Sequence, residues 1–130
     1  MKTAATKASE IKREKHTIDV KGKILGRISS EIAQLLMGKS KPYFVRNLDL
    51  GDFVTVINAS EVVLTGRKEK DKKYYRYSGY PGGLTIETVE KLRIRKPTEI
   101  VLHAVKGMLP QNKLRDTMLK RLAIYAKEQK

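Results

Sequence analysis

The pattern of apolar and polar residues in the first half of the chain predicts a β-α-β unit. Residues 16–20 form a short strand-like run, and from Ile24 the apolar residues recur at helical spacing up to Gly38, a favourable helix C-cap. Residues 53–59 are almost wholly apolar and rich in β-branched side chains, which predicts a strand covered on both faces, as in a parallel sheet. The long connection over residues 39–52 completes the unit, and its crossover is expected to be right-handed.

The second half of the chain predicts shorter elements, in which helices dominate. Tyrosines favour a strand at the start of this half, and apolar residues at helical spacing follow. The alternation of strands and helices indicates an α/β protein. The predicted elements are a helical turn capped by Ser60 and ended by Gly66, a strand over 73–77, helices over 85–95, 97–109 and 113–121, and a weak strand over 123–126.

The length of 130 residues fits one domain with a substantial core. We expect residues 16–130 to form this domain. Residues 1–15 carry five Lys or Arg and two Glu, and they predict a basic N-terminal arm that is ordered mainly by its partner. A frayed terminus without a role is the alternative. The arm has no apolar centre, so it is not a secretory signal.

The charge balance indicates a polyanionic partner. Lys and Arg number 28 against 14 Asp and Glu, which gives a net charge of +14 at pH 7. Nucleic acid is favoured over an acidic protein or a membrane surface. The chain contains no cysteine, which excludes disulfides, a thiolate zinc site and a cysteine nucleophile. No apolar run approaches the roughly 20 residues of a membrane span, so no span is expected.

Two basic segments carry the predicted nucleic-acid contacts. Residues 67–83 combine a cationic run with four of the six tyrosines and a glycine-rich end, so cations can pair with phosphates while tyrosine rings stack on unpaired bases. Residues 106–121 place further cations around a proline-bounded turn. A solvated charged surface is the alternative for both segments. The predicted contacts are Lys23, Arg27, Lys39, Lys41, Arg46, Arg67, Lys68, Lys70, Lys72, Lys73, Tyr75, Arg76, Tyr77, Lys106, Lys113, Arg115, Lys120 and Arg121.

Asp49 and Asp52, just ahead of the apolar strand, leave several interpretations open. Paired carboxylates can hold Mg²⁺ or act as acid and base, and the protein would then be an enzyme acting on nucleic acid or nucleotides. The same residues fit a turn that leads into a strand. They also fit a clamp for Arg46 or Lys23.

Other candidate sites are weaker. Residues 38–40, Gly-Lys-Ser, resemble the end of a phosphate-binding loop, but that motif requires a glycine where the chain has Ala33. It also requires a preceding strand, whereas a helix is predicted there. The only histidines, His16 and His103, have no partner at metal-ligand spacing. The sequence therefore predicts neither a nucleoside triphosphate site nor a histidine metal site.

Three blocks of sequence, together with their spacing, cover nearly all of residues 18–126. The blocks are residues 19–31; residues 51–59 continuing through 64–66 to 73–83; and residues 104–110 with 119–125. In their joint match and spacing they resemble the bacterial-type ribosomal protein L13 family of the large subunit.

The resemblance implies a fold, a partner and a place in the cell. The fold is a three-layer α/β/α arrangement around a small, mostly parallel sheet. The partners are large-subunit ribosomal RNA and neighbouring large-subunit proteins, with a part in early subunit assembly. No enzymatic activity, cofactor, metal or small-molecule substrate is implied. The expected location is the cytoplasmic ribosome, with an organellar ribosome as the alternative.

Overall fold

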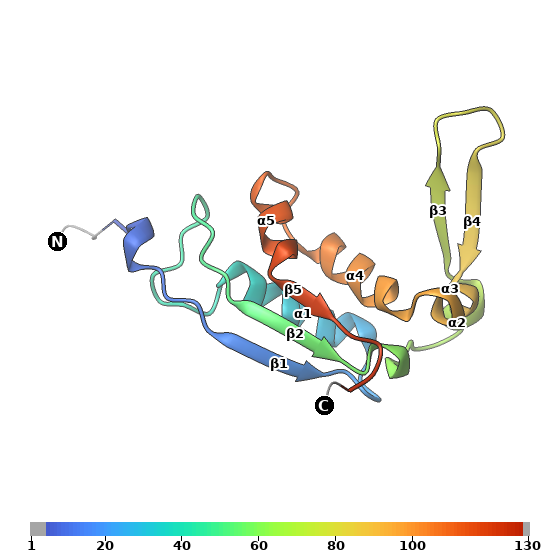
Figure 1. The fold of residues 1–130 in the computed structure, drawn as a ribbon, viewed down its shortest axis with the longest axis horizontal. Coiled ribbons are helices and arrows are strands. Elements are labelled where there is room, and N and C mark those ends of the chain that lie inside the picture. The colour runs from blue at the N-terminus through green and yellow to red at the C-terminus, as the bar shows by residue number, and fades with distance from the viewer. Residues whose placement is uncertain (1–4, 129–130) are drawn as a thin grey trace.

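A three-stranded parallel sheet lies at the centre of the computed structural model, which describes residues 5–128 (Figure 1). Its strand order is β1-β2-β5, so the central strand pairs with one strand from each end of the chain. The bounds of the strands are β1 Lys15–Asp19, β2 Phe53–Ile57 and β5 Leu122–Ile124. The predicted α/β class and the mostly parallel sheet are confirmed.

Within residues 5–128, five helices and a hairpin complete the fold. The first long helix lies between β1 and β2, as the predicted β-α-β unit requires, and the hairpin separates the two halves of the chain. Two short 3₁₀ turns are η1 Ala8–Glu10 and η2 Ala59–Glu61. The helices are α1 Leu25–Met37, α2 Lys68–Asp71, α3 Val89–Arg95, α4 Pro97–Met108 and α5 Leu114–Lys120, and the hairpin strands are β3 Lys73–Tyr77 and β4 Leu84–Thr88.

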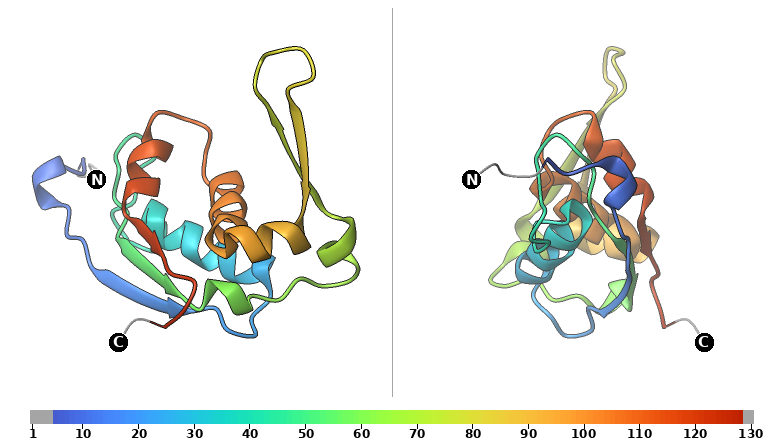
Figure 2. Two further views of the ribbon diagram at one scale, coloured as in Figure 1. Left: turned by 45° about the vertical axis from the view of Figure 1, so that its right-hand side comes forward. Right: turned by 90° about the vertical axis from the view of Figure 1, so that its left-hand side faces the viewer.

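The helices that contact the sheet all lie on one of its faces (Figure 2). Val54 and Val56 of β2 point to that face and are buried, whereas Phe53 is 44% exposed. The prediction that this strand is covered on both faces is therefore wrong: its apolar run alternates between the core and a half-open face. The described residues thus place one helical layer on the sheet, where the resemblance implies two.

Helices α1 and α4 pack against each other and close the core. Ile28, Ile32 and Leu36 of α1 are buried with Ile100 and Val105 of α4 in one hydrophobic cluster. Burial of such side chains contributes about 1.5–3 kcal/mol each. The predicted cap at Gly38 is confirmed, because its φ is 74° and its N–H donates to the carbonyls of the last helical turn.

The β3–β4 hairpin stands out from the body and corrects one predicted helix (Figure 2). Residues 84–88 are not helical but form β4, antiparallel to β3, with Tyr75 opposite Ile86 and Tyr77 opposite Leu84. The helix begins only at Val89. Apolar Leu84 and Ile86 alternate with polar side chains, and their cross-strand pairing with the tyrosines outweighs the helix-start signal of Thr85 and Glu87.

A second correction concerns residues 60–66. The expected helical turn extends only over η2, and Val63 then forms a parallel bridge with Ile24. Ser60 does not cap a helix; its hydroxyl donates to the carbonyl of Ala126 at 2.7 Å. This bond joins the end of β2 to the segment after β5.

The described part of the N-terminal arm lies against the connection between α1 and β2. The Thr6 hydroxyl donates to the Tyr43 carbonyl at 2.9 Å, and Arg13 donates to the Asp49 carbonyl at 2.9 Å. Residues 1–4 of the predicted arm lie outside the described residues. Among residues 5–128, no helix combines the length and the apolarity needed to cross a bilayer.

Candidate nucleic-acid interface

The first predicted segment forms an exposed cationic surface around α2 and the hairpin. We call it the α2–hairpin surface and define it by Arg67, Lys68, Lys70, Lys72, Lys73, Tyr75, Arg76 and Tyr77, all of which are exposed. Helix α2 is only one turn long and carries Glu69 on its inner side. There Arg93 of α3 donates to both carboxylate oxygens of Glu69, at 2.7 and 2.9 Å. This bidentate pair neutralises one of the two acids in the segment, which leaves the cations facing outward in excess.

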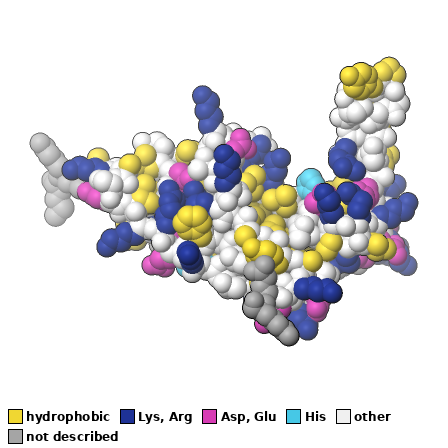
Figure 3. All heavy atoms as spheres, viewed as in Figure 1, with side chains coloured by type: hydrophobic (Ala, Val, Ile, Leu, Met, Phe, Trp, Pro, Cys, Tyr) yellow, Lys and Arg dark blue, Asp and Glu magenta, His cyan; other side chains and the backbone are white. Residues whose placement is uncertain are grey.

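The two faces of the hairpin differ in chemistry. Tyr75 and Tyr77 share one face with Leu84 and Ile86, and all four are more than half exposed. Figure 3 shows few charged side chains on the outer part of the hairpin and a hydrophobic tip. The exposed tyrosine rings thus lie on the same face as Lys73, a combination of aromatic side chains and positive charge that suits single-stranded nucleic acid.

The opposite face of the hairpin carries Arg76 and an ion-pair network. Arg95 donates to both oxygens of Glu87, at 2.9 and 2.8 Å, while Arg76 lies 3.8 Å from the same carboxylate. The hydrogen bond from Arg95 holds the pKa of Glu87 below its usual range. Arg95 also lies 3.5 Å from Glu99, so two guanidinium groups meet two carboxylates in this network, and Arg76, 61% exposed, is its most accessible cation.

A hollow at the base of the hairpin contains residues that sequence reasoning missed. Lys73 and Arg76 line it together with Arg95 and His103, and the His103 ring centroid lies 5.2 Å from that of Tyr74. Arg95 belongs to a basic run at residues 91–96 that the predicted contacts omit, so charge pattern is a signal that could have found it. His103 carries no such signal, because only the fold brings α4 to the hairpin.

Two further predicted contacts, Lys39 and Arg46, line a cavity of about 390 Å³, whereas none of the predicted cations of residues 106–121 lines it. We call it the loop cavity: it lies between the end of α1, the connection after it and the α4–α5 turn. Lys39 and Arg46 line it from one side, and residues 108–110 with Asn112 line it from the other. The fold thus places two cations of the α1–β2 connection beside uncharged residues from the distant α4–α5 turn. Phe44 and Asn112 also line the cavity, and sequence reasoning did not single them out.

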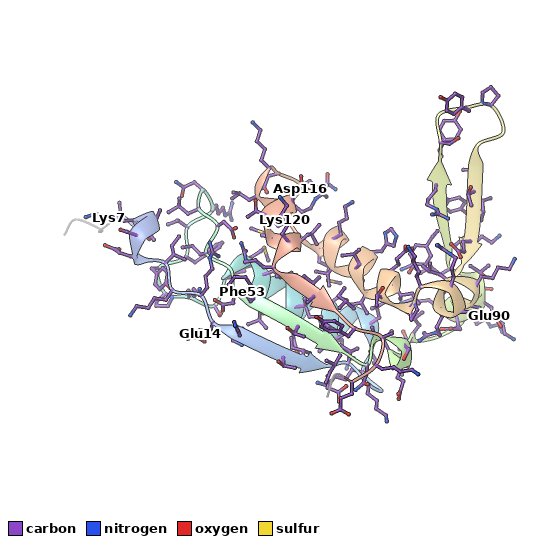
Figure 4. All side chains as sticks on the ribbon, in the orientation of Figure 1. Lys7, Glu14, Phe53, Glu90, Asp116 and Lys120 are labelled. Atoms are coloured by element: carbon purple, nitrogen blue, oxygen red, sulfur yellow. The ribbon has the colours of Figure 1, made fainter. Side chains whose placement is uncertain are left out.

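The remaining predicted side chains are more dispersed. Lys106, Lys113 and Lys120 are exposed on α4 and α5, and Figure 4 labels Lys120 on α5. Arg115 is half-buried, and its Nε has no hydrogen-bond partner among the described residues. Lys23 and Arg27 are exposed, but they lie at the N-terminal end of α1, whereas Lys39 and the loop cavity lie beyond its C-terminal end.

Arg121 is an exception among the predicted contacts, because it is held inside the protein. Only 9% of the residue is exposed. Its guanidinium pairs with both oxygens of Asp49 and donates to the Leu36 carbonyl at 3.0 Å. A cation saturated in this way is unavailable to a phosphate. We therefore remove Arg121 from the interface and assign it to the structure of the body.

Lys41 is the second exception. Its ammonium lies 2.7 Å from Asp52 Oδ1 and donates to the carbonyls of Lys12 and Leu50 at 2.6 and 2.7 Å. Asp52 also pairs with the His16 ring, at 3.0 Å. The two aspartates thus act as clamps, but their cations are Arg121, Lys41 and Arg13 and not the expected Arg46 or Lys23.

This clamp also bears on the possible metal site. Glu14, His16 and Asp52 place ligand atoms within 4.8 Å of one another. Lys41 contacts Asp52 Oδ1 at 2.7 Å and the His16 ring contacts Oδ2 at 3.0 Å, so both carboxylate oxygens already have partners, and the ammonium supplies the compensating positive charge. The arrangement therefore fits an ionic clamp between β1, β2 and the connection better than a metal centre.

The clamp predicts a dependence of stability on pH. Burial raises the pKa of Asp52, but the hydrogen bonds from Lys41, Glu14 N–H and His16 outweigh it, so the pKa is lowered. A lowered folded-state pKa stabilises the protein above the unfolded value, near pH 4, and this contribution is lost as pH falls through the folded value. We expect the stability advantage of the native chain over Asp52→Asn to shrink below about pH 4. Urea unfolding of both proteins between about pH 3 and 6 measures this difference in the free energy of unfolding. A difference that stays constant over this pH range would contradict the clamp.

The fold and the charge distribution define the chain as a strongly basic α/β protein with a projecting hairpin. Residues 13–130 match the family model of ribosomal protein L13. The chain belongs to this family. Large ribosomal subunit protein uL13 of Syntrophus aciditrophicus is 52% identical over 126 residues, which cover 97% of this chain and 89% of the relative.

Other relatives agree with this assignment. Large ribosomal subunit protein uL13 of Dictyoglomus thermophilum is 51% identical over 97% of this chain and 89% of its own length. The uL13 protein of Caldanaerobacter subterraneus is 52% identical over 96% of this chain and 87% of its own length. The resemblance found in the sequence is thus confirmed, and with it the prediction of a ribosomal protein that is not an enzyme.

Proposed function

We propose that the chain is a structural protein of the large ribosomal subunit that binds large-subunit RNA and assists early subunit assembly. The observation that carries this proposal is the outward placement of the predicted cations. All predicted side chains except Lys41, Arg115 and Arg121 are exposed, and most of them gather at the α2–hairpin surface and the loop cavity. The net charge of +14 supplies the matching long-range attraction.

The geometry supports a mechanism in which two surfaces bind different RNA segments. The body between them is a sheet covered by packed helices, so it holds the two surfaces at a fixed separation. Joining two RNA segments in one orientation favours the folded RNA over its alternatives. Recognition by shape and phosphate spacing is expected, since the major groove of A-form RNA is too narrow to be read by side chains.

The proposal assigns different roles to parts of the chain. Residues 16–130 are the proposed RNA-binding domain and residues 1–15 the proposed arm, of which Thr6 and Arg13 bond to the connection before β2. Tyr75 and Tyr77 stack on unpaired bases, while the cations at the hairpin base contact phosphates. Neighbouring large-subunit proteins are further partners, and the cytoplasmic ribosome is the expected location.

A double substitution at the α2–hairpin surface tests the proposal. Lys68 and Lys73 are exposed and have no acidic ion-pair partner among the described residues, so replacing both with alanine removes two free phosphate-binding charges. We expect affinity for a large-subunit RNA transcript to fall at least about 10-fold. The log–log salt slope should become shallower by about 1.5–2, as measured by filter binding across a salt series.

The matched control is Lys21→Ala with Lys96→Ala. These lysines pair with Glu61 at 3.4 Å and Glu99 at 3.6 Å, so the double variant changes the net charge equally but removes no free cation from the proposed surface. We expect this control to change the affinity for the RNA transcript by less than about 3-fold. Equal losses in the two double variants would show that net charge alone drives binding, and undetectable RNA binding by the native chain would refute the proposal.

A further inference from the structure

The loop cavity has the features of a small-ligand site. Its volume of about 390 Å³ lies near the lower end of the roughly 300–1,000 Å³ typical of such sites. Its lining is mostly apolar and includes Met37, Phe44, Met108 and Met118. Methionine adapts to irregular shapes, and its sulfur contacts aromatic rings favourably. The cavity therefore suits a flat, largely apolar group.

The charged groups at the cavity are of one sign. Lys39 and Arg46 are exposed, and no acidic side chain is among the described residues that line the cavity. A ligand with an apolar body and a negative charge at one end satisfies both features. A nucleotide has this construction, with a flat base and a phosphate.

Asn112 adds a directed hydrogen-bond donor. Its Oδ1 accepts the N–H of Leu114 at 3.1 Å, at the start of α5. Because this bond fixes the side-chain oxygen, the amide nitrogen remains as a donor beside the cavity. Base edges carry carbonyl oxygens and ring nitrogens that accept from such a donor.

We propose that the loop cavity binds one unstacked nucleotide of the RNA, an inference that rests on the proposed RNA-binding function. The base enters the apolar lining, the adjacent phosphate pairs with Lys39 and Arg46, and the Asn112 amide donates to the base edge. A peptide helix fits less well, because it requires an extended groove with several anchor positions along it. The loop cavity is instead a single compact hollow formed by three chain segments.

The methionines of the chain allow a direct test. Three of the four methionines line the cavity, and the fourth is Met1. We would produce the full chain with photo-methionine, bind it to a large-subunit RNA transcript, irradiate, digest the RNA and map adducts by mass spectrometry. The expected result is a nucleotide adduct on Met37, Met108 or Met118. Stable RNA binding without an adduct at these positions would overturn the inference but leave the proposed function intact.

A matched pair of variants tests the role of Asn112. Asn112→Asp keeps the oxygen that accepts from Leu114, but it replaces the donor with a carboxylate oxygen. Gln111→Glu makes the same change of charge at the exposed neighbouring residue, which does not line the cavity. We expect Asn112→Asp to weaken RNA binding about 10-fold and to abolish the methionine–nucleotide adduct. Gln111→Glu should change the RNA affinity less than about 3-fold and should still form the adduct.

Two further outcomes separate the inference from its alternatives. Equal behaviour of the two variants would overturn it, because the effect would then be one of general charge. In a reconstituted large subunit, adducts from the cavity methionines to a neighbouring protein and not to RNA would identify a peptide occupant, which also overturns it. If the native chain binds no RNA in filter binding, the proposed function fails and this inference fails with it, an outcome distinct from stable RNA binding without an adduct.

Discussion

Replacing Arg121 with methionine is expected to lower the free energy of unfolding by about 3–5 kcal/mol. Methionine retains much of the side-chain volume but leaves the Asp49 carboxylate, only 11% exposed, without its bidentate partner. It also removes a donor from the Leu36 carbonyl at the end of α1. Urea unfolding followed by circular dichroism measures the loss.

The neighbouring residue supplies the control. Lys120 is exposed on α5 (Figure 4), and Lys120→Met makes the same change of charge one position away. We expect it to alter stability by less than about 0.5 kcal/mol. If the two variants were equally stable, Arg121 would not be the structural clamp, and its place among the RNA contacts would have to be restored.

Replacing Gly51 with alanine is expected to destabilise the protein by about 3 kcal/mol, at the upper end of the usual cost of overpacking. A Cβ at this position would overlap the backbone carbonyl of Leu36 and would lie 2.5 Å from Nη2 of Arg121. The connection before β2 would have to move away from α1, which weakens the Arg121 clamp as well. The midpoint temperature of thermal unfolding and the urea concentration at the unfolding midpoint would both fall.

Gly26→Ala is the matched control with the opposite expected sign. Gly26 is an exposed residue in the first turns of α1, and an added Cβ meets no heavy atom within 4 Å in the described structure. Because alanine has the higher helix propensity, we expect a stabilisation of about 0.5–1 kcal/mol. Destabilisation of similar size by both substitutions would argue against the close approach at Gly51.

The sequence predicted the elements whose periodicity is dictated by a single buried face. Helices α1 and α4 have clear apolar stripes, and β2 is a continuous apolar run, so their positions were found within a few residues. Strand β4 was missed because its residues are mostly exposed and no buried face shaped their pattern. The half-open face of the sheet was missed because an exposed Phe53 is indistinguishable in sequence from a buried one.

The sequence predicted that the candidate interface is rich in cations. It could not predict which of these cations form ion pairs with carboxylates inside the protein. A lysine in a basic run has the same sequence signature whether it faces solvent or a buried carboxylate. Only the fold shows that Lys41 and Arg121 neutralise Asp52 and Asp49, while Lys39, two residues from Lys41, stays exposed at the loop cavity. For the same reason the sequence could not identify Asn112 as a candidate binding residue, because three distant segments form the cavity that it lines.

The position of β5 in the sheet has a consequence for synthesis of the protein. The central strand β2 receives its second neighbour only from residues 122–124, and the preceding Arg121 is needed to neutralise Asp49. Until that segment leaves the exit tunnel of the translating ribosome, β2 pairs with β1 alone and the nascent chain holds an incomplete core. Native packing is therefore achieved only after elongation has passed this point, and a truncated chain that lacks β5 keeps an open edge on β2 and an incomplete core.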